Sequence, residues 1–412
     1  MTRVSAELKA MWDWSWYVWR YRLTDGGKVV LIAIFCSGMA AAVSLEIPVY
    51  HLFISLICLY AFSWMTSFLF QPRVKVKGKF PERGVEGIPF EVIFLLKNPG
   101  RRAVYDVGVG LFGLPRCFRL LNEELIYPVI PPGGQARVKV TILPQRRGWY
   151  KLPDALVYTS FPFHLRRTGE IFHRLGAITI WPSFQPIQTL NLPLSQRHQP
   201  GGLAFGSHCG DSPEYVGNRE YRPGDPARRI DFRSWARLAR PVVKEYQEEY
   251  YSRVGLVLDT FIGPRQSAKR EMELEAAISL TAAIAEVVCQ GESVVDLFAA
   301  GSTIHTFRAG RSIGQFQQIL DILACLEGSY FCPFEKILPS LTEEYQGMSA
   351  VIFVFLRWDE IRRQLVQRAR EGQSVSRVIL VKKDKLAVVV DLDGKEIVQV
   401  TPEEVKKGLL DQ

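Results

Sequence analysis

Cysteine is scarce in this 412-residue sequence and follows no recognisable spacing. The chain has seven cysteines, an odd number, and two of them, Cys36 and Cys58, lie inside apolar runs. It contains no CxxC pair and no Cys/His cluster. The pattern therefore favours neither a disulfide framework nor a structural zinc site, and it is typical of reduced thiols in a cytoplasmic setting.

Common catalytic and nucleotide-binding motifs are also missing. The sequence has no GxxxxGK[ST] phosphate loop and no GxSxG nucleophile elbow, and no GxGxxG follows the apolar strand predicted at residues 254–259. A hydrophobic content of 48% excludes general disorder. The formal charge of +9, from 51 Lys and Arg against 42 Asp and Glu, favours anionic partners such as nucleic acid or the inner face of a membrane.

Two long uncharged runs lie near the N-terminus. Residues 29–45 carry no charge over 17 positions, and residues 47–70 carry none over 24 positions if His51 is neutral. As helices they would measure about 26 Å and about 36 Å, against a hydrocarbon core of about 30 Å. We therefore predict two transmembrane helices within residues 29–70. A buried hairpin in a soluble protein is the alternative, but the neighbouring sequence offers too little apolar surface to cover it.

Basic residues precede and follow the predicted helix pair, whereas the short loop between the helices has none. The positive-inside rule then places both termini in the cytoplasm, as in a multi-pass protein of the inner (cytoplasmic) membrane. Residues 1–28 are predicted to form a cytoplasmic or interfacial segment. Within it, residues 11–21 are dense in Trp and Tyr, which favour the headgroup region.

The middle of the chain has a different pattern. Residues 73–185 contain short runs rich in β-branched and aromatic residues, separated by turns with Pro and Gly. This spacing predicts an all-β, immunoglobulin-like sandwich, which we interpret as a spacer or interaction module. Residues 186–212 have the Pro, Gly and Ser content of a linker.

Residues 213–412 contain the arginine-rich segment and then an alternation of apolar strands with helices. The strands are predicted at residues 254–259, 294–300, 349–358 and 375–383, and the helices at residues 269–290, 313–328 and 359–372. Such alternation predicts an α/β doubly wound, mainly parallel sheet. Residues 385–401 are predicted to form a closing hairpin.

Asp259 ends the first predicted strand, at the edge where doubly wound sheets bind ligands. The residues that follow it, Thr260, Phe261, Ile262 and Gly263, add only one hydroxyl group. A hard cation such as Mg²⁺ needs several oxygen ligands close together. We therefore predict no metal site and no cofactor.

The segment at residues 218–240 holds seven arginines and no lysine. Asp225 is followed by proline, so we predict that it caps the N-terminus of a helix. That helix would carry a stripe of arginines at four-residue spacing: Arg229, Arg233 and Arg237.

Three functions compete for this segment. A nucleic-acid site would use arginines and aromatic rings, but the acidic residues at positions 245–249 weaken the positive field. A catalytic anion site would need a nucleophile or general base, and neither Tyr nor Cys has a partner His here. A structural and docking seam would pair arginines with nearby carboxylates and leave a face for a protein. We favour the docking seam, and expect a protein partner and no nucleic acid.

The same segment resembles the signature of the bacterial family known as domain of unknown function 58 (DUF58). The matching residues keep the fixed spacing of that signature: Arg219, Tyr221, Gly224, Asp225, Arg229, Ile230, Asp231, Phe232, Ala236, Arg237, Glu245 and Glu248. Residues 146–167, with their RRG-x-Y element, and the two predicted membrane helices are also similar to the usual arrangement in this family. The resemblance therefore covers nearly the whole chain.

This resemblance implies a von Willebrand factor A-like fold for the C-terminal part. It also implies a MoxR-type AAA+ ATPase as partner, in chaperone-like maturation or envelope processes. The D-x-S-x-S metal motif of true A domains is degenerate after Asp259, so cation-mediated binding is not expected.

We thus predict a non-enzymatic, membrane-anchored adaptor. Its partner-docking seam would consist of Arg219, Tyr221, Gly224, Asp225, Arg229, Asp231, Arg233, Trp235, Arg237 and Glu245. The alternative is a membrane-tethered hydrolase or anion-binding enzyme with its site between the arginine-rich segment and Asp259.

Overall fold

The computed structural model divides the chain into two compact units, unit 1 at Met1–Ser183 and unit 2 at Phe184–Gln412. The residues that it describes are 18–43, 47–122, 126–172, 175–187, 214–225, 227, 230–247, 252–264, 267–290, 293–300, 304–309, 313–332, 334, 348–372, 374–384 and 397–408.

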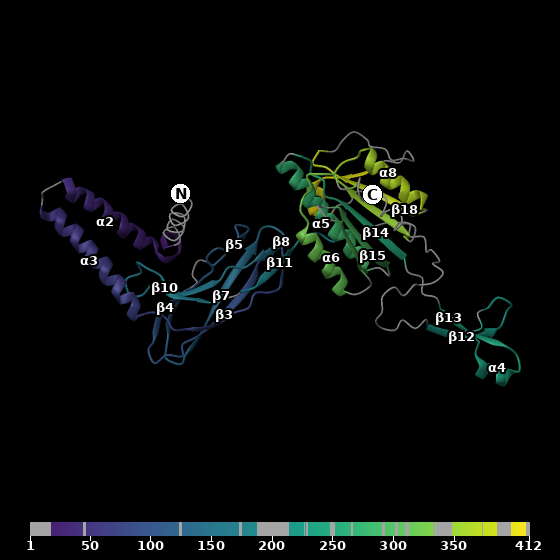
Figure 1. Cartoon of the computed structure of the whole chain (residues 1–412), viewed down its shortest axis with the longest axis horizontal. Helices are drawn as coiled ribbons and strands as arrows, with labels where there is room; N and C mark the ends of the chain where they lie inside the picture. Colours follow the sequence, from purple (N-terminus) through teal and green to yellow (C-terminus); the bar gives the residue numbers. More distant parts are fainter. Residues whose placement is uncertain are drawn as a thin grey trace, which may run out of the picture. The chain divides into compact units, whose positions relative to one another are not determined.

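Unit 1 begins with a short π-helical turn, η1 (Val18–Arg22), and two long helices, α2 (Asp25–Val43) and α3 (Ile47–Leu69) (Figure 1). Both long helices are apolar and long enough to cross a bilayer, and 17% of the most apolar window of each is buried in the protein. The core helix of a soluble protein would be mostly buried, so length, composition and exposure indicate membrane association. Residues 1–17, which include most of the predicted interfacial segment, lie outside the described residues.

The remainder of unit 1 consists of three sheets. Two have four strands each, in the orders β1-β3-β7-β5 and β10-β9-β4-β6, and the third has the order β2-β11-β8. All pairs are antiparallel except β2 with β11. The strand bounds are β1 Lys75–Lys77, β2 Arg83–Val85, β3 Phe90–Lys97, β4 Val104–Gly110, β5 Phe118–Leu120, β6 Ile126–Ile130, β7 Gln135–Pro144, β8 Gly148–Lys151, β9 Ala155–Thr159, β10 Thr168–Phe172 and β11 Ala177–Trp181.

Alternating burial explains how these strands form a core. Along β3 and β7 every second side chain is buried and its neighbours face solvent or are half-buried, which is the pattern of a sheet with one covered face. Fully buried residues from both four-stranded sheets, among them Phe94 on β3 and Ile130 on β6, belong to one hydrophobic cluster. The predicted all-β character of residues 73–185 is confirmed.

The start of α2 is held to the turn that precedes β10. The backbone N–H of Thr24 donates to the Leu165 carbonyl (3.3 Å), and that of Arg167 donates to the Arg22 carbonyl (2.7 Å). The Arg167 side chain also donates from Nη1 to the Leu23 carbonyl (3.1 Å). Backbone contacts on both sides therefore join the apolar helices to the β-rich part of unit 1.

Unit 2 contains a six-stranded sheet with the order β16-β15-β14-β17-β18-β19. Neighbouring strands are parallel, except that β16 runs antiparallel to β15. Counted along the chain, the order is that of a doubly wound fold, which confirms the predicted class. The bounds are β14 Ser252–Asp259, β15 Ser293–Ala300, β16 Ile304–Ala309, β17 Ala350–Phe355, β18 Val375–Val381, β19 Val398–Val400, α5 Ala268–Gln290, α6 Ile313–Cys325, α8 Glu360–Glu371 and α9 Pro402–Lys407.

Helices cover both faces of this sheet (Figure 1). On one face, Leu365 and Val366 of α8 share a buried cluster with Phe353 and Phe355 of β17. On the other face α5 packs against β14, β15 and β17 and is buried along most of its length. Because both faces are covered, a central strand such as β17 is buried at every position and reads as a continuous apolar run.

One strand of unit 2 was not predicted from the sequence, and two predicted segments are only partly described by the structure. The antiparallel edge strand β16 is not predicted by the sequence pattern. A closing hairpin is predicted for residues 385–401. Within this range β19 pairs in parallel with β18, and residues 385–396, which would form the other arm, lie outside the described residues, so the hairpin stays a prediction. Residues 188–212 of the predicted linker also lie outside them.

Candidate functional site

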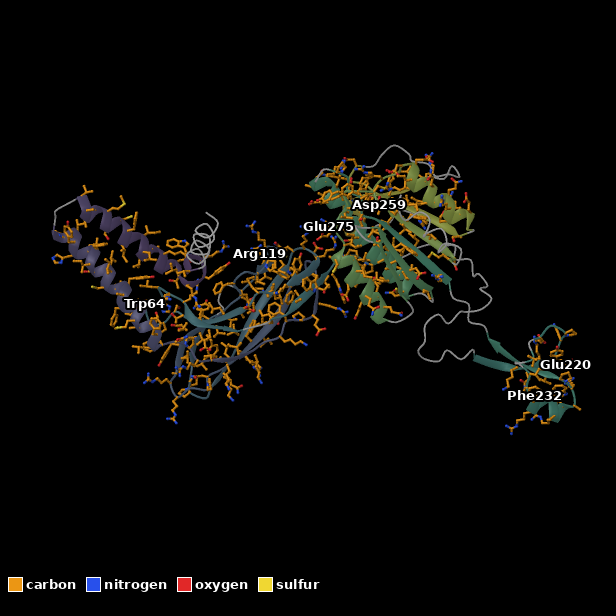
Figure 2. All side chains as sticks on the ribbon, in the orientation of Figure 1. Trp64, Arg119, Glu220, Phe232, Asp259 and Glu275 are labelled. Atoms are coloured by element: carbon orange, nitrogen blue, oxygen red, sulfur yellow. The ribbon has the colours of Figure 1, made fainter. Side chains whose placement is uncertain are left out.

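The arginine-rich segment forms a small structure of its own. Strands β12 (Glu214–Glu220) and β13 (Val242–Gln247) pair antiparallel as a separate two-stranded sheet, and α4 (Phe232–Leu238) lies in the connection between them. These three elements and their turns are called the motif hairpin. Figure 2 labels Glu220 at the end of β12 and Phe232 at the start of α4.

Asp225 does not cap α4, which starts after Asp231, and this corrects the predicted start of the arginine-bearing helix. Arg219 binds its carboxylate with two hydrogen bonds, Nη1 to Oδ2 at 2.7 Å and Nη2 to Oδ1 at 2.8 Å, and the backbone N–H of Arg222 donates to Oδ2 at 2.8 Å. Gly224 lies in this turn with φ of 107°, a conformation that other residues rarely adopt. Because the bidentate guanidinium contact is the stronger interaction, Asp225 closes the turn after β12 and the helix starts later.

Asp231 has the capping role instead. Its Oδ1 accepts from the backbone N–H groups of Arg233 (3.2 Å) and Ser234 (3.4 Å). Its Oδ2 accepts from Asn218 Nδ2 (3.0 Å) and Ser234 Oγ (2.6 Å). Helix α4 therefore begins directly after Asp231, and both carboxylate oxygens of that residue are occupied.

Helix α4 presents two aromatic and two arginine side chains to solvent. Phe232 is 67% exposed and Trp235 is 38% exposed, and their rings stack with centroids 6.0 Å apart. Arg233 and Arg237 are exposed, and neither forms an ion pair with any residue that the structure describes. These four residues, which lie on more than one side of this short helix, are together called the α4 face. Exposed Trp and Arg side chains are typical of protein-binding hot spots.

The remaining predicted site residues divide between described and undescribed parts of the chain. Tyr221 is 36% exposed, and its backbone N–H donates to the Pro241 carbonyl at 3.0 Å. Arg229 lies outside the described residues, and so does the side chain of Glu245, whose backbone pairs with Gly217 across the hairpin. Within the described residues, the predicted arginine stripe therefore consists of the two arginines of the α4 face.

The two aspartates of the motif hairpin have lowered pKa values. Hydrogen bonds, chiefly from Arg219 to Asp225 and from Ser234 and Asn218 to Asp231, lower the pKa of each carboxyl from 3.8 to about 2. Because folding favours the ionised forms, the stability that they contribute is complete above about pH 4 and is lost as the pH falls through about 2.

We expect a ¹³C NMR titration of the carboxyl groups, assigned with Asp225→Asn and Asp231→Asn variants, to give both midpoints near pH 2. A midpoint close to the ordinary value for either residue would show that its hydrogen bonds are not formed in solution.

A buried ion pair lies at the carboxyl end of β14. Asp259 and Arg362, which is in the first turn of α8, both have fully buried side chains. Arg362 donates from Nε to Asp259 Oδ2 at 2.8 Å, and its Nη2 lies 2.7 Å from the same oxygen. The backbone N–H of Phe261 donates to Oδ1 (3.0 Å) and that of Leu356 donates to Oδ2 (3.3 Å). Both oxygens of the Asp259 carboxylate therefore accept hydrogen bonds from protein groups, and neither is free to bind a metal ion.

Arg362 is held in place by further contacts. Its Nη1 pairs with Asp359, the N-cap residue of α8. Three aromatic rings lie within 6.0 Å of its guanidinium carbon: Phe261, Phe334 and Phe355. Burial lowers the pKa of Arg362, but Asp259 and Asp359 raise it more strongly, so its net shift is upward. Complete burial raises the pKa of Asp259, while Arg362 and the two backbone N–H groups act in the opposite direction.

The residues around Asp259 do not fit a divalent cation. A fixed guanidinium occupies the position beside the carboxylate, and a second positive charge there would be repelled. Within the described parts of the chain, no group of three or more His, Cys, Asp or Glu side chains is arranged to hold a metal ion. The sequence interpretation missed Arg362. The available signal was an arginine in the first turn of the helix that follows the strand next to β14.

Two more guanidinium groups converge near this ion pair. A Cβ built on Gly263 would lie 2.5 Å from Arg270 Nη1 and 2.8 Å from Arg357 Nη2. Arg270 donates to the Ile262 carbonyl at 2.8 Å, and Arg357 lies over the ring of Phe261. Neither is paired with a carboxylate among the residues that the structure describes.

Lys382, at the end of β18, is affected by this positive charge. Burial lowers its pKa, and Glu273, 3.7 Å away, acts in the opposite direction. Three nearby positive charges lower the pKa of Lys382 further: Arg357, Lys269 and Arg270. Lys269 and Lys382 are themselves paired with Asp384 and Glu273, so among the described residues the unpaired positive charge at this edge belongs to Arg270 and Arg357.

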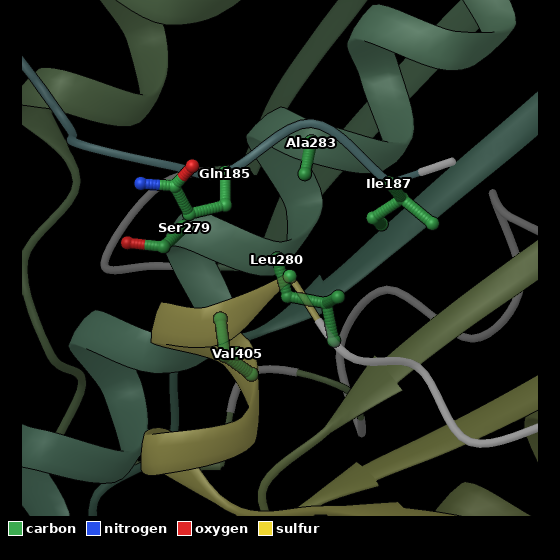
Figure 3. A pocket seen from close by; sticks show the side chains of 7 residues that line it. Gln185, Ile187, Ser279, Leu280, Ala283 and Val405 are labelled. Atoms are coloured by element: carbon green, nitrogen blue, oxygen red, sulfur yellow. The ribbon is translucent and has the colours of Figure 1, made fainter. Parts of the chain in front are cut away.

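Unit 2 also contains a crevice beside α5, but its size excludes a substrate. Its volume is about 10 Å³, which is enough for no more than a single water molecule. Figure 3 shows it between the chain that enters unit 2, helix α5 and helix α9. The lining residues are Gln185, Ile187, Ser279, Leu280, Ala283, Val405 and Gly408. This crevice is a packing gap between elements and has no room for a ligand.

A family comparison matches the region that contains the motif hairpin. Residues 217–337 match the model of the family described as "Protein of unknown function DUF58". The matched region runs from β12 through α4, β14, α5, β15 and β16 to α6 and beyond. The resemblance to this family that the sequence motif predicts is confirmed.

Other comparisons add little. No curated protein matches the chain significantly. Among solved structures, the VesB protease of Vibrio cholerae is 16% identical over 29% of this chain and 35% of its own, with a TM-score of 0.19. The secreted serine protease VesC from Vibrio cholerae is 11% identical over 30% of this chain and 26% of its own, with a TM-score of 0.19. The matches thus span about a third or less of either protease, and TM-scores this low support no statement about fold or activity.

Proposed function

We propose that the chain, whose residues 217–337 match the DUF58 family model, is a non-enzymatic, membrane-anchored adaptor. Its partner would be a MoxR-type AAA+ ATPase, and the α4 face would bind that ATPase in chaperone-like maturation or envelope processes. The observation that carries the proposal is the composition of the α4 face, where the helix that exposes the stacked Phe232 and Trp235 also exposes two arginines that the described chain does not neutralise.

The architecture of the proposed adaptor has three parts. Helices α2 and α3 would cross the inner membrane with both termini in the cytoplasm, which agrees with the basic residues on either side of them. The β-rich part of unit 1 would be an immunoglobulin-like spacer. The sheet of unit 2 would be von Willebrand factor A-like, and its doubly wound strand order with one antiparallel edge supports this.

An enzymatic role is the alternative, and the environment of the acidic residues favours the adaptor. The anion-binding enzyme of this alternative would use a free carboxylate in a pocket where arginines converge. Asp225, Asp231 and Asp259 each have both carboxylate oxygens engaged by donors of the chain. The arginines of the α4 face are exposed and lie on an open surface.

The test is a binding measurement between the full-length protein in detergent and a purified MoxR-type ATPase from the same organism. We expect the Arg233→Glu/Arg237→Glu variant to bind at least about tenfold more weakly than the wild type, because two central hot-spot charges are reversed. The matched control is Arg363→Glu/Lys407→Glu, which makes the same change in charge at exposed positions on α8 and α9.

Equal binding by the wild type and the Arg233/Arg237 variant would remove the α4 face as the docking surface. An equal loss in the control variant would mean that only the overall charge matters. No binding of the wild type to any such ATPase would remove the proposed partner.

A further inference from the structure

A cavity of about 830 Å³ lies in unit 1 where α3 ends and the sheets begin. Its volume is in the range of small-molecule binding sites, about 300–1,000 Å³. It is lined by Phe68, Leu69, Phe70, Gln71, Arg73, Asn98, Gly100, Arg101, Arg102, Ala103, Val104, Tyr105, Thr159 and Phe161. Binding of a partner at the α4 face does not involve this cavity.

The polar wall of the cavity carries positive charge only. Arg73, Arg101 and Arg102 line it together with uncharged residues, and the lining contains no carboxylate. All three arginines are exposed, and none forms an ion pair with a residue in the described ranges. Three guanidinium groups around one cavity favour an anion, and phosphate matches the geometry of their donors.

The opposite wall is apolar and belongs to the end of α3. Phe68 and Leu69 are 57% and 69% exposed, which is unusual for adjacent large apolar residues unless acyl chains or a partner cover them. Phe70 packs edge-on against Phe161 (5.0 Å between centroids), and Phe161 stacks on Tyr105 (4.9 Å). The cavity thus combines an apolar wall at the helix end with a cationic wall on the sheet side.

Buried polar side chains fix the sheet side of the cavity. Asn98 is 1% exposed, and its Nδ2 donates to the carbonyls of Arg102 (2.8 Å), Ile130 (3.1 Å) and Pro131 (3.2 Å), which holds the turn that carries the arginines. Thr159 of β9 donates from Oγ1 to the Tyr105 carbonyl of β4 at 2.6 Å. The sheet side of the cavity is therefore supported by hydrogen bonds of the chain itself.

We propose that this cavity binds the phosphate headgroup of an anionic phospholipid. The lipid would come from the leaflet that meets the C-terminal end of α3, with its acyl chains along Phe68 and Leu69. A helix that spans the hydrocarbon core ends at headgroup depth, and basic pockets at that depth bind anionic headgroups. This inference rests on the membrane anchoring in the proposed function. A free phosphate would use the arginines but not the apolar wall.

The experiment uses the full-length protein in micelles of uncharged detergent with added phosphatidylglycerol or phosphatidylcholine, and measures bound lipid by native mass spectrometry. We expect saturable binding of phosphatidylglycerol and little binding of phosphatidylcholine. The Arg101→Gln/Arg102→Gln variant should bind phosphatidylglycerol roughly 25-fold more weakly, because each arginine near a headgroup contributes about a fivefold factor.

Two variants act as controls. Arg116→Gln/Arg119→Gln removes the same charge from exposed positions around β5, outside the cavity lining, and should bind like the wild type. Arg101→Lys/Arg102→Lys keeps the charge and should retain most of the binding. An equal loss in the Arg116/Arg119 variant, or unchanged binding in the Arg101/Arg102 variant, would overturn the proposal. Inorganic phosphate that displaces the lipid at equal concentration would assign the site to a free anion and also overturn it.

Failure of this inference can be separated from failure of the proposed function. If the wild type inserts into phosphatidylcholine vesicles but shows no preference for phosphatidylglycerol, the headgroup site is wrong while the anchor stands. If the protein stays soluble without detergent or vesicles, the anchoring itself is wrong. Binding of the ATPase to the α4 face is measured independently of both.

Discussion

The Arg362→Met variant is expected to lose about 3–5 kcal/mol of stability in the six-stranded sheet, because it leaves the fully buried carboxylate of Asp259 without its cation. Methionine fills much of the volume of the arginine side chain, so the loss would come from the unpaired charge more than from a cavity. The measurement is urea unfolding of the full-length protein, with hydrogen exchange of β14 and β17 by mass spectrometry to localise the effect.

The neighbouring position provides a matched control. Arg363 is 48% exposed and its guanidinium lies 3.5 Å from Glu360, so Arg363→Met should change stability by no more than about 0.5 kcal/mol. The double variant Asp259→Leu/Arg362→Met removes both buried charges and should recover most of the loss. If the double variant is as unstable as Arg362→Met alone, the pair acts through packing and not through charge.

Gly27→Ala is expected to separate α2 from the turn before β10. A Cβ on Gly27 would lie 1.9 Å from the carbonyl oxygen of Leu165, and this backbone atom cannot rotate away. The turn must therefore move, which breaks the hydrogen bonds between Thr24, Leu165 and Arg167 that hold the helix start. We expect a destabilisation of about 1–3 kcal/mol, as for other overpacked sites.

The readouts are the thermal unfolding midpoint and the rate of trypsin cleavage after Arg166 and Arg167, which should rise when the turn is released. Gly26→Ala is the matched control, because its Cβ would have no neighbour closer than 3.8 Å. In a helix this alanine should be neutral or stabilising by up to about 1 kcal/mol. The same effect from both substitutions would contradict the close contact at Gly27.

Local periodicity made most of the fold predictable from the sequence. The uncharged runs identified α2 and α3, the alternation in runs such as FEVIFLLK identified the sheets of unit 1, and the alternation of apolar strands with helices identified the doubly wound sheet. In each case the pattern repeats within one element, so neighbouring residues contain the information. The edge strand β16 was missed because its few residues, IHTFRA, show no strong alternation.

The details of the site depended on residues that are far apart in sequence. The sequence predicts Asp225 as the helix cap, but Arg219 on β12 holds Asp225 in a turn, and Asn218 on β12 binds Asp231, which caps α4. The partner of Asp259 is 103 positions further along the chain. Its position in the first turn of α8 does not distinguish Arg362 from Arg363.

One consequence of the Asp259–Arg362 pair concerns the conditions under which this edge of the sheet can work. A guanidinium that is covalently part of the chain cannot be diluted, exchanged for another ion or extracted by a chelator. The structure at the end of β14 should therefore be the same in EDTA and in millimolar magnesium.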